Sequence, residues 1–267
     1  MFVVCGEALM DVYMGASTPT GMTLDARIGG SPLNVAQGLA RLARPAAFLT
    51  GLSTDALGER LLASLKAEGV DTSLILRNDA PSTLSVVSVD ASGIPRYAFH
   101  GNGAADRQIT HDTMPALPPA ARVLQFGSYA LVVEQMVSIA HLVKVSDEDL
   151  GLLFPAETPE QVSARWLSQG ASLVAVTRGR HGASAWTRGA NADVPSPETT
   201  VIDTVGAGDT FQAAMLTWLD EHDALTPEAV GALDAPSLDA MLRFAARAAA
   251  ITCSRRGADM PRRAELG

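Results

Sequence analysis

Short apolar runs alternate along this chain with segments of helical periodicity, and this alternation restricts the fold more than any other feature. Buried strands are predicted at Phe2–Cys5, Ala47–Gly51, Val123–Phe126, Leu142–Val145, Leu173–Thr177 and Ala183–Thr187. Helices are predicted at Asn34–Leu42, Leu57–Glu68, Asp209–Leu219 and Ser237–Cys253. Strands separated by helices form a mainly parallel sheet that is covered on both faces, so we predict a single α/β domain over residues 1–267.

One segment departs from this rhythm. Ser82–Asp90 alternates at period two and Pro95–Phe99 follows a glycine-containing turn, which predicts a β-hairpin. Because an isolated hairpin is marginally stable, we expect Leu9–Tyr13 to pair with it. The hairpin would then belong to a small inserted β-flap, or lid, over residues 9–28 and 82–105 that closes over a ligand. The pattern is equally compatible with a hairpin that extends the edge of the main sheet.

Composition excludes several classes of protein. The 20 basic residues against 29 acidic ones give a net charge of −9, which argues against a nucleic-acid partner. No apolar run is long enough to cross a bilayer, so we expect a cytoplasmic protein without a membrane partner. Cys5 and Cys253 are expected to be reduced thiols rather than a disulfide. The tail from Asp259 is expected to be loosely held.

The glycine-rich segment Asp203-Thr-Val-Gly-Ala-Gly-Asp209 leads directly into an apolar helix. Small residues let a ligand approach the backbone, and the first N–H groups of a helix have no partner within it, so this end suits a phosphate. A carboxylate repels phosphate, so Asp209 needs another purpose, such as taking a proton from an attacking hydroxyl. The structural alternative is a glycine-rich helix start with an Asp N-cap.

Two further segments offer polar groups to a ligand that carries hydroxyls. Asn34 ends the segment Gly29-Gly30-Ser-Pro-Leu-Asn34, in the first turn of a predicted helix, and its amide both donates and accepts. A turn with a capping residue is the alternative. Asp11 follows an apolar strand, and α/β sheets bind ligands at the carboxyl ends of their strands. Its alternative is a solvated loop carboxylate.

These segments together resemble the ribokinase-like (PfkB) family of sugar kinases. The likeness rests on Gly6-Glu7 with Asp11, on Gly29–Asn34, on Gly51 with Asp55-Ala-Leu-Gly58, and on Asp203–Asp209. The Ser-Pro-Leu-Asn variant and Tyr97-Ala-Phe99 with Ala104-Ala-Asp106 most resemble the fructokinase branch. The resemblance implies a ribokinase-like α/β fold and ATP-dependent phosphorylation of a primary hydroxyl on a small sugar, with fructose favoured. 2-Keto-3-deoxygluconate or another ketose is the alternative substrate.

Roles for individual residues follow from the resemblance. Asp209 would be the general base, and the backbone amides of Gly206, Ala207 and Gly208 would form an anion hole for the transferring phosphoryl group. The residues implied in sugar binding are Asp11, Gly29, Gly30, Asn34 and Asp106. Those implied in nucleotide binding are Thr177, Gly179, Gly182, Thr204, Gly206 and Gly208.

Two cations are implied besides ATP. The family has an N-x-x-E motif for Mg²⁺ where this chain has Ser146-Asp-Glu-Asp149. Asp149 can supply a hard oxygen ligand to Mg²⁺, but Ser-x-x-Asp is also typical of a helix capping box. K⁺ would be held near Asp203 by carbonyls of the Asp203–Val205 turn and of the Ser254–Gly257 segment.

The middle of the chain departs from the family pattern in length. Between Val133 and His141 only a short stretch stands where the family has a helix, a strand and a second helix. Either a βαβ unit has been lost or the sequence omits an internal stretch. Omission is favoured, because loss of a central strand would expose both neighbours as unpaired edges. A real deletion would favour a catalytically inactive sugar- or nucleotide-binding relative. A homodimer through the flap is also expected.

Overall fold

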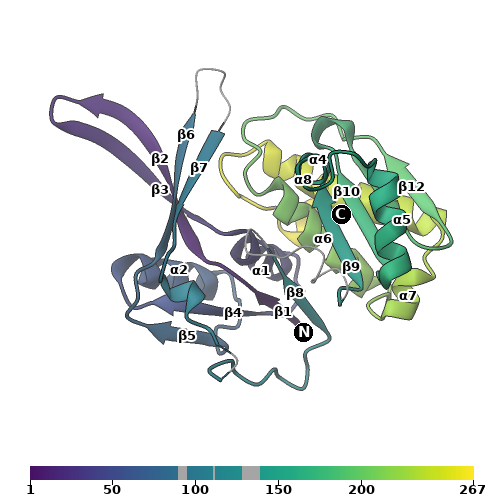
Figure 1. Ribbon diagram of the computed structural model, residues 1–267, viewed down its shortest axis with the longest axis horizontal. Helices are drawn as coiled ribbons and strands as arrows, with labels where there is room; N and C mark the ends of the chain where they lie inside the picture. The colour runs from purple at the N-terminus through teal and green to yellow at the C-terminus, as the bar shows by residue number, and fades with distance from the viewer. Residues whose placement is uncertain (90–94, 111, 128–138) are drawn as a thin grey trace. The chain divides into compact units, whose positions relative to one another are not determined.

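The computed structural model describes residues 1–89, 95–110, 112–127 and 139–267 (Figure 1). Contacts divide the chain into two compact units, residues 1–40 with 44–128 and residues 41–43 with 129–267. Within the described ranges the strands form three four-stranded sheets, two in the first unit and one in the second. No helix in these ranges is long and apolar enough to span a membrane.

The first unit contains a parallel sheet in the order β5-β4-β1-β8. Its strands are β1 (Phe2–Cys5), β4 (Ala46–Ser53), β5 (Ile75–Asn78) and β8 (Val123–Phe126). Its helices are α1 (Ser31–Arg41), α2 (Ala56–Ala67) and the short 3₁₀ helix η1 (Ala105–Arg107). Every residue of β4 is buried, as expected for a strand of a parallel sheet covered on both faces. The strands and helices predicted here are confirmed, with ends that differ by a few residues.

The second sheet of this unit is the predicted flap, with strand order β3-β2-β6-β7. Its strands are β2 (Leu9–Thr18), β3 (Gly21–Gly29), β6 (Thr83–Val89) and β7 (Pro95–His100). The expected pairing of Leu9–Tyr13 with the hairpin is confirmed, since β2 runs parallel to β6 from Leu9 to Tyr13. The flap is a separate sheet, so the alternative of an extended main sheet is wrong. The predicted turn at 91–93 lies outside the described residues.

The second unit contains a mixed sheet in the order β12-β11-β10-β9. Its strands are β9 (Leu142–Ser146), β10 (Leu173–Thr177), β11 (Ala183–Trp186) and β12 (Asn191–Val194). Its α-helices are α4 (Asp147–Leu153), α5 (Pro159–Gln169), α6 (Ala207–Glu221), α7 (Pro227–Gly231) and α8 (Ala235–Cys253). Two 3₁₀ helices are η2 (Gly179–His181) and η3 (Arg263–Glu265).

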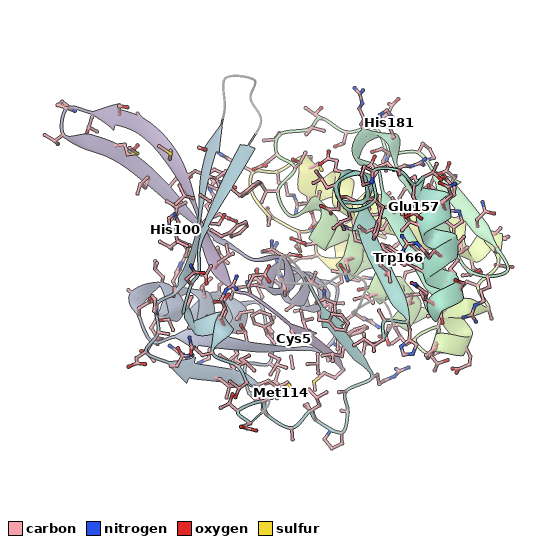
Figure 2. The ribbon with its side chains drawn as sticks, viewed as in Figure 1. Cys5, His100, Met114, Glu157, Trp166 and His181 are labelled. Carbon is pink, nitrogen blue, oxygen red and sulfur yellow. The ribbon has the colours of Figure 1, made fainter. Side chains whose placement is uncertain are left out.

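Helices cover both faces of this sheet. On one face Val174 and Val176 of β10 pack with Trp166 of α5, which is 1% exposed and is labelled in Figure 2. The intervening Leu173 and Ala175 are also fully buried, and side chains alternate between faces, so the opposite face is covered as well. Contacts of α8 with β11 and β12 supply that cover. The loops of this sheet therefore start from strands that are buried on both faces.

In the described ranges the first sheet ends at β8 and the sheet of the second unit ends at β9. β8 pairs with β1, and β9 pairs with β10. The stretch that the sequence marks as shortened lies mainly in residues 128–138, outside the described residues. The additional strand expected from the family pattern falls between β8 and β9 in the sequence.

The expectation of a loosely held tail is wrong. Met260 and Leu266 are 2% and 3% exposed, so the segment contributes to the core of the second unit. The Arg263 guanidinium donates to both carboxylate oxygens of Glu221, at 2.9 and 3.1 Å, and Arg255 pairs with Glu265. Buried apolar residues and ion pairs fix the segment, and neither can be predicted from its polar composition.

Candidate functional site

Asp11 lies in the Leu9–Tyr13 segment that was expected to pair with the hairpin, inside a strand, so its alternative of a solvated loop carboxylate is wrong. It is the third residue of β2 and pairs with Arg27 of β3 on one side and Ser85 of β6 on the other. In the next row of the same face, Leu9 pairs with Gly29 and with Thr83. Asp11 thus belongs to the base of the flap, on a face that also carries the hydroxyls of Ser85 and Thr83.

Gly29 and Gly30 are glycines for different steric reasons. A Cβ on Gly29 would lie 2.1 Å from Oδ2 of Asp11, so the missing side chain leaves the place that this carboxylate occupies. Gly30 has a φ of +105°, and a Cβ there would lie 2.7 Å from the carbonyl oxygen of Glu7. Both glycines therefore set the geometry around Asp11 and the start of α1.

Asn34 lies in the first turn of α1, as predicted, and is 6% exposed. Its backbone N–H donates to the carbonyl of Gly30 at 2.9 Å, which fixes the turn that follows the two glycines. The helix begins at Ser31, so Asn34 is not its cap. Asn34 is therefore buried inside the first turn of α1 rather than at its cap.

Asp106 is anchored by the flap and by the neighbouring sheet. Oγ1 of Thr83 donates to the Asp106 carboxylate at 2.6 Å. Burial raises the pKa of Asp106, although the Thr83 hydrogen bond and the charge of Arg107 act in the opposite direction. The backbone of η1 packs directly against β4, since a Cβ on Gly51 would lie 2.0 Å from the carbonyl oxygen of Ala105. Thr83 thus connects Asp106 to the face that carries Asp11.

The Asp55–Gly58 motif is explained by structure alone. Oδ1 of Asp55 accepts from the backbone N–H of Gly58 at 2.7 Å and from the Ser82 hydroxyl at 2.8 Å, and Oδ2 accepts from the Ser82 N–H at 2.9 Å. Burial alone would raise the pKa of Asp55, but these hydrogen bonds outweigh it and lower the pKa to about 2. Asp55 therefore ties the start of α2 to the start of β6, one residue before Thr83.

The first turn of α6 in the second unit has the predicted form of an anion site. Gly206 is the N-cap with a φ of +76°, and a Cβ on it would lie 2.5 Å from the Cβ of Ala258. Asp209 is the third residue of the helix, so the alternative of an Asp N-cap is wrong. The backbone N–H of Ala207 donates to the carbonyl of Thr204 at 3.2 Å, and that of Gly208 belongs to the amide end of a 15-residue helix, where anions are stabilised.

Asp203 fixes the loop that leads into this helix. Its two carboxylate oxygens accept from the backbone N–H groups of Val205 at 3.1 Å and Gly257 at 2.8 Å. Thr210 continues the anchoring, because its hydroxyl donates to the carbonyl of Gly206 at 2.8 Å and lies 2.9 Å from the hydroxyl of Thr252. The loop is therefore attached to the end of α8 before any ligand binds.

Lys144, on β9, lies directly beside the first turn of α6. A Cβ on Gly208 would lie 2.8 Å from Nζ of Lys144. Desolvation lowers the pKa of this lysine, although the charges of Asp209 and Asp149 favour its protonated form. The sequence analysis did not identify this residue. Strand alternation with the apolar Val143 and Val145 could have shown that Lys144 faces the other side of β9.

Ser146 and Asp149 form the capping arrangement that was the structural alternative for this pair. The backbone N–H of Asp149 donates to Oγ of Ser146 at 3.0 Å, and that hydroxyl donates to Oδ2 of Asp149 at 2.6 Å. Asp149 is nevertheless exposed, so its other oxygen can accept a ligand. Within the described ranges no group of three or more His, Cys, Asp and Glu residues could hold a metal ion alone.

The predicted nucleotide-binding segment follows β10 in the second unit. Thr177 ends β10 and donates to the carbonyl of Val145 at 3.4 Å. Gly179 and Gly182 have φ values of +49° and +91°, and a Cβ on Gly182 would lie 1.9 Å from the carbonyl oxygen of Val194. Thr204 lies before the cap of α6, where its carbonyl accepts from Ala207 at 3.2 Å.

The predicted residues thus fall into two groups, each on one unit. Residues predicted to bind sugar belong to the first unit: Asp11, Gly29, Gly30, Asn34 and Asp106. Residues predicted for catalysis, nucleotide and cations belong to the second: Asp149, Thr177, Gly179, Gly182 and 203–209. Sequence reasoning missed Thr83, Lys144 and Ser85. The Ser85 hydroxyl is buried without a hydrogen-bond partner among the described residues, as fits a surface that receives a polar ligand.

Comparisons with known proteins bear on the family of this chain. The family model described as pfkB family carbohydrate kinase matches residues 1–128 and 121–264. A fructokinase of Rhizobium leguminosarum bv. trifolii is 34% identical over 279 residues, covering 89% of this chain and 85% of the relative. A solved structure of a fructokinase with bound ATP from Xylella fastidiosa has a TM-score of 0.85 at 27% identity, covering 99% of this chain and 96% of that one.

The comparisons also bear on chain length. The alignment with fructokinase-1 of Zea mays, 28% identical, has 317 positions and covers 100% of this chain and 96% of the relative. Since this chain has 267 residues, the relative carries residues that have no counterpart here. The family model matches in two pieces that overlap at 121–128, a range that contains β8.

Proposed function

Because this chain belongs to the pfkB family of carbohydrate kinases, we propose that it transfers the γ-phosphate of ATP to a primary hydroxyl of fructose. The observation that carries the reaction is the position of Asp209 in the first turn of α6, at the amide end of the helix and three residues after an αL glycine cap. The choice of fructose is supported by the relatives, which are named as fructokinases. Another ketose, such as 2-keto-3-deoxygluconate, is the alternative.

The chemistry requires little of the protein beyond placement and charge. In the proposed step a sugar hydroxyl oxygen bonds to the γ-phosphorus, the bond from that phosphorus to the β,γ-bridging oxygen breaks, and Asp209 accepts the hydroxyl proton. The amides at 206–208 stabilise the charge on the phosphoryl oxygens. Substituting the base is expected to slow turnover without abolishing nucleotide binding.

The sugar is proposed to bind to the flap base of the first unit. Asp11 and Asp106 supply acceptors for sugar hydroxyls, and Asn34 supplies both a donor and an acceptor. Asp106 is held by Thr83 at 2.6 Å, so its second oxygen faces the ligand with one position already fixed. The flap would then exclude water, which competes with the sugar as phosphoryl acceptor.

Two cations are proposed with the nucleotide. Mg²⁺ keeps several waters and binds through one or two carboxylates plus substrate phosphates, which fits the exposed Asp149 better than a closed protein cage. When bound it neutralises phosphate charge. K⁺ near Asp203 is supported only by the carbonyl-rich turn there. Replacing K⁺ by tetramethylammonium in the assay tests the K⁺ site, and unchanged turnover would refute it.

The flap is proposed to join two copies of this chain. On the face opposite Asp11, Met14 pairs with Leu24 and Val12 pairs with Ala26. Met14 and Leu24 are 49% and 59% exposed, so an apolar sheet face is in contact with water. Light scattering at micromolar concentration should give a dimer, and Leu24→Arg should give a monomer. A monomeric wild type would refute this assembly.

A cytoplasmic location is proposed as well. Cys5 and Cys253 are both free, which fits a reducing compartment. Burial raises the pKa of each thiol, with a further contribution from Glu7 at Cys5 and from Asp203 at Cys253, so neither is activated for disulfide exchange. Fractionation of the native cells with immunodetection tests the location.

A second function is favoured by one observation, the end of the two sheets at β8 and β9. A chain that lacks the intervening strand could bind sugar or nucleotide without turnover. Intact mass of the purified protein, followed by coupled ADP release with fructose and other ketoses, separates the two. Sugar-dependent ADP release at a mass of 27.8 kDa supports the kinase. Ligand-induced thermal stabilisation without ADP release supports the inactive relative.

A further inference from the structure

The ammonium of Lys144 lies where desolvation disfavours its positive charge. The chain has only two lysines, and Lys66 is on the exposed side of α2. Lys144 is half-buried over its length, and Val143 and Val145 on either side pack into the apolar cluster with Trp166. Side chains alternate along a strand, so Lys144 points to the other face, where α6 begins. Its ammonium ends beside Gly208.

The surroundings of the ammonium are those of an anion site. Asp209 and Asp149 are the carboxylates that act on it electrostatically. The ammonium ends beside the first turn of α6, whose amides carry partial positive charge. The ammonium charge and the helix amides would both attract a phosphoryl group.

Gly208 supports this assignment. Its side-chain position is taken by Nζ of Lys144, at 2.8 Å from where a Cβ would lie. Any other residue at 208 would push the ammonium away from the first turn of the helix. Unlike Gly206, Gly208 has an ordinary helical φ, so backbone conformation does not require glycine there.

We propose that Lys144 is a further catalytic residue, whose ammonium contacts the phosphoryl group in transit, and that Gly208 is glycine to leave the ammonium that place. This rests on the proposed kinase function. The ammonium stays protonated throughout: the hydroxyl proton goes to Asp209, the oxygen–phosphorus bond to the sugar forms, and ADP leaves. Lys144 stabilises the charge on the equatorial phosphoryl oxygens.

The first test compares Lys144→Met with Lys66→Met. Methionine keeps the length of the side chain and removes the charge. Turnover of Lys144→Met should fall by about 10²–10³-fold, as for the loss of one oxyanion donor. The KM for the sugar should stay within about threefold, because the residues predicted to bind it lie on the first unit. Lys66→Met should behave as wild type. Unchanged turnover in Lys144→Met overturns the proposal.

The second test is a double-mutant cycle of Gly208→Ala with Lys144→Ala. Gly208→Ala alone should cost much of the activity, because the new methyl displaces the ammonium. In the Lys144→Ala background the same substitution should cost less than about threefold, since the space is then free. If the two losses multiply, Gly208 does not make room for Lys144 and that part of the proposal fails.

A binding measurement separates this proposal from the kinase function itself. Calorimetry with ATP and with adenosine should show ATP affinity at least about tenfold weaker in Lys144→Met, with adenosine affinity unchanged. If the wild type binds ATP but phosphorylates no ketose, the proposed kinase function fails, yet the ratio of ATP affinities between wild type and Lys144→Met still tests whether Lys144 contacts the phosphates. Equal ATP affinity in the two proteins overturns the proposed Lys144 contact. Circular dichroism confirms that each variant is folded.

Discussion

The carboxylate of Asp55 connects the stability of the first unit to the predicted sugar site, and this link can be measured. It accepts three hydrogen bonds, two of them from Ser82. In Asp55→Asn, one of the two oxygens becomes an NH₂ group. Oδ1 can still cap α2, but the NH₂ then faces the N–H of Ser82, donor against donor.

The magnitude follows from the lowered pKa. The difference between 3.8 and about 2 corresponds, at about 1.4 kcal/mol per pKa unit, to at most about 2.5 kcal/mol. Asp55 is partly exposed, so solvent screening reduces this to about 1–2 kcal/mol. Because the folded state has the lower pKa, this stabilisation is complete above about pH 4 and is lost as the pH falls towards 2.

Urea denaturation of the wild type and Asp55→Asn, followed by circular dichroism at pH 7 and pH 3, measures the effect. The two proteins should differ by about 1–2 kcal/mol at pH 7 and by less at pH 3. The sugar KM should also rise, since Ser82 precedes the Thr83 that holds Asp106. Asp234→Asn is the matched control, an N-cap in the second unit with hydrogen bonds to Ser237 only. An equal effect of both substitutions would refute the reasoning.

Three further predictions address Asp209, two glycines with positive φ and the unfolding of the two units. Asp209→Asn should lower turnover by about 10²–10⁴-fold with ATP affinity nearly unchanged, and calorimetry showing lost ATP binding would contradict the role of a base. Gly206→Ala should destabilise the fold more than Gly69→Ala, although the two glycines have nearly equal φ values of +76° and +77°. The reason is steric: a Cβ on Gly206 would lie 2.5 Å from the Cβ of Ala258, whereas a Cβ on Gly69 would have nothing within 4 Å. Thermal melts test this, and equal shifts would contradict it. Calorimetric unfolding should show two transitions, one for each unit, and a single transition would show that the two units unfold cooperatively.

Particular elements show why some predictions succeeded. β1 and β10 are short apolar runs between turns, and α6 follows a glycine-rich start, so local pattern was enough to place them. Asp209 was assigned because its neighbours are diagnostic, and its position in the first turn of α6 is what was expected. β3 was not specified as a strand, because its mixed, mostly exposed residues lack a buried face. Its pairing with β2 forms it.

The sequence by itself determined the α/β class, the flap hairpin and the glycine-rich helix start, because each depends on residues near one another in the chain. Tertiary structure alone decided that Asp11 shares a face with Thr83, that Asp55 ties α2 to β6, and that Lys144 ends beside Gly208. These contacts join residues that are far apart in the chain. Asp55 and Ser82 are 27 positions apart, and Lys144 and Gly208 are separated by many more. Strand register and packing bring them together, and local periodicity carries no information on either.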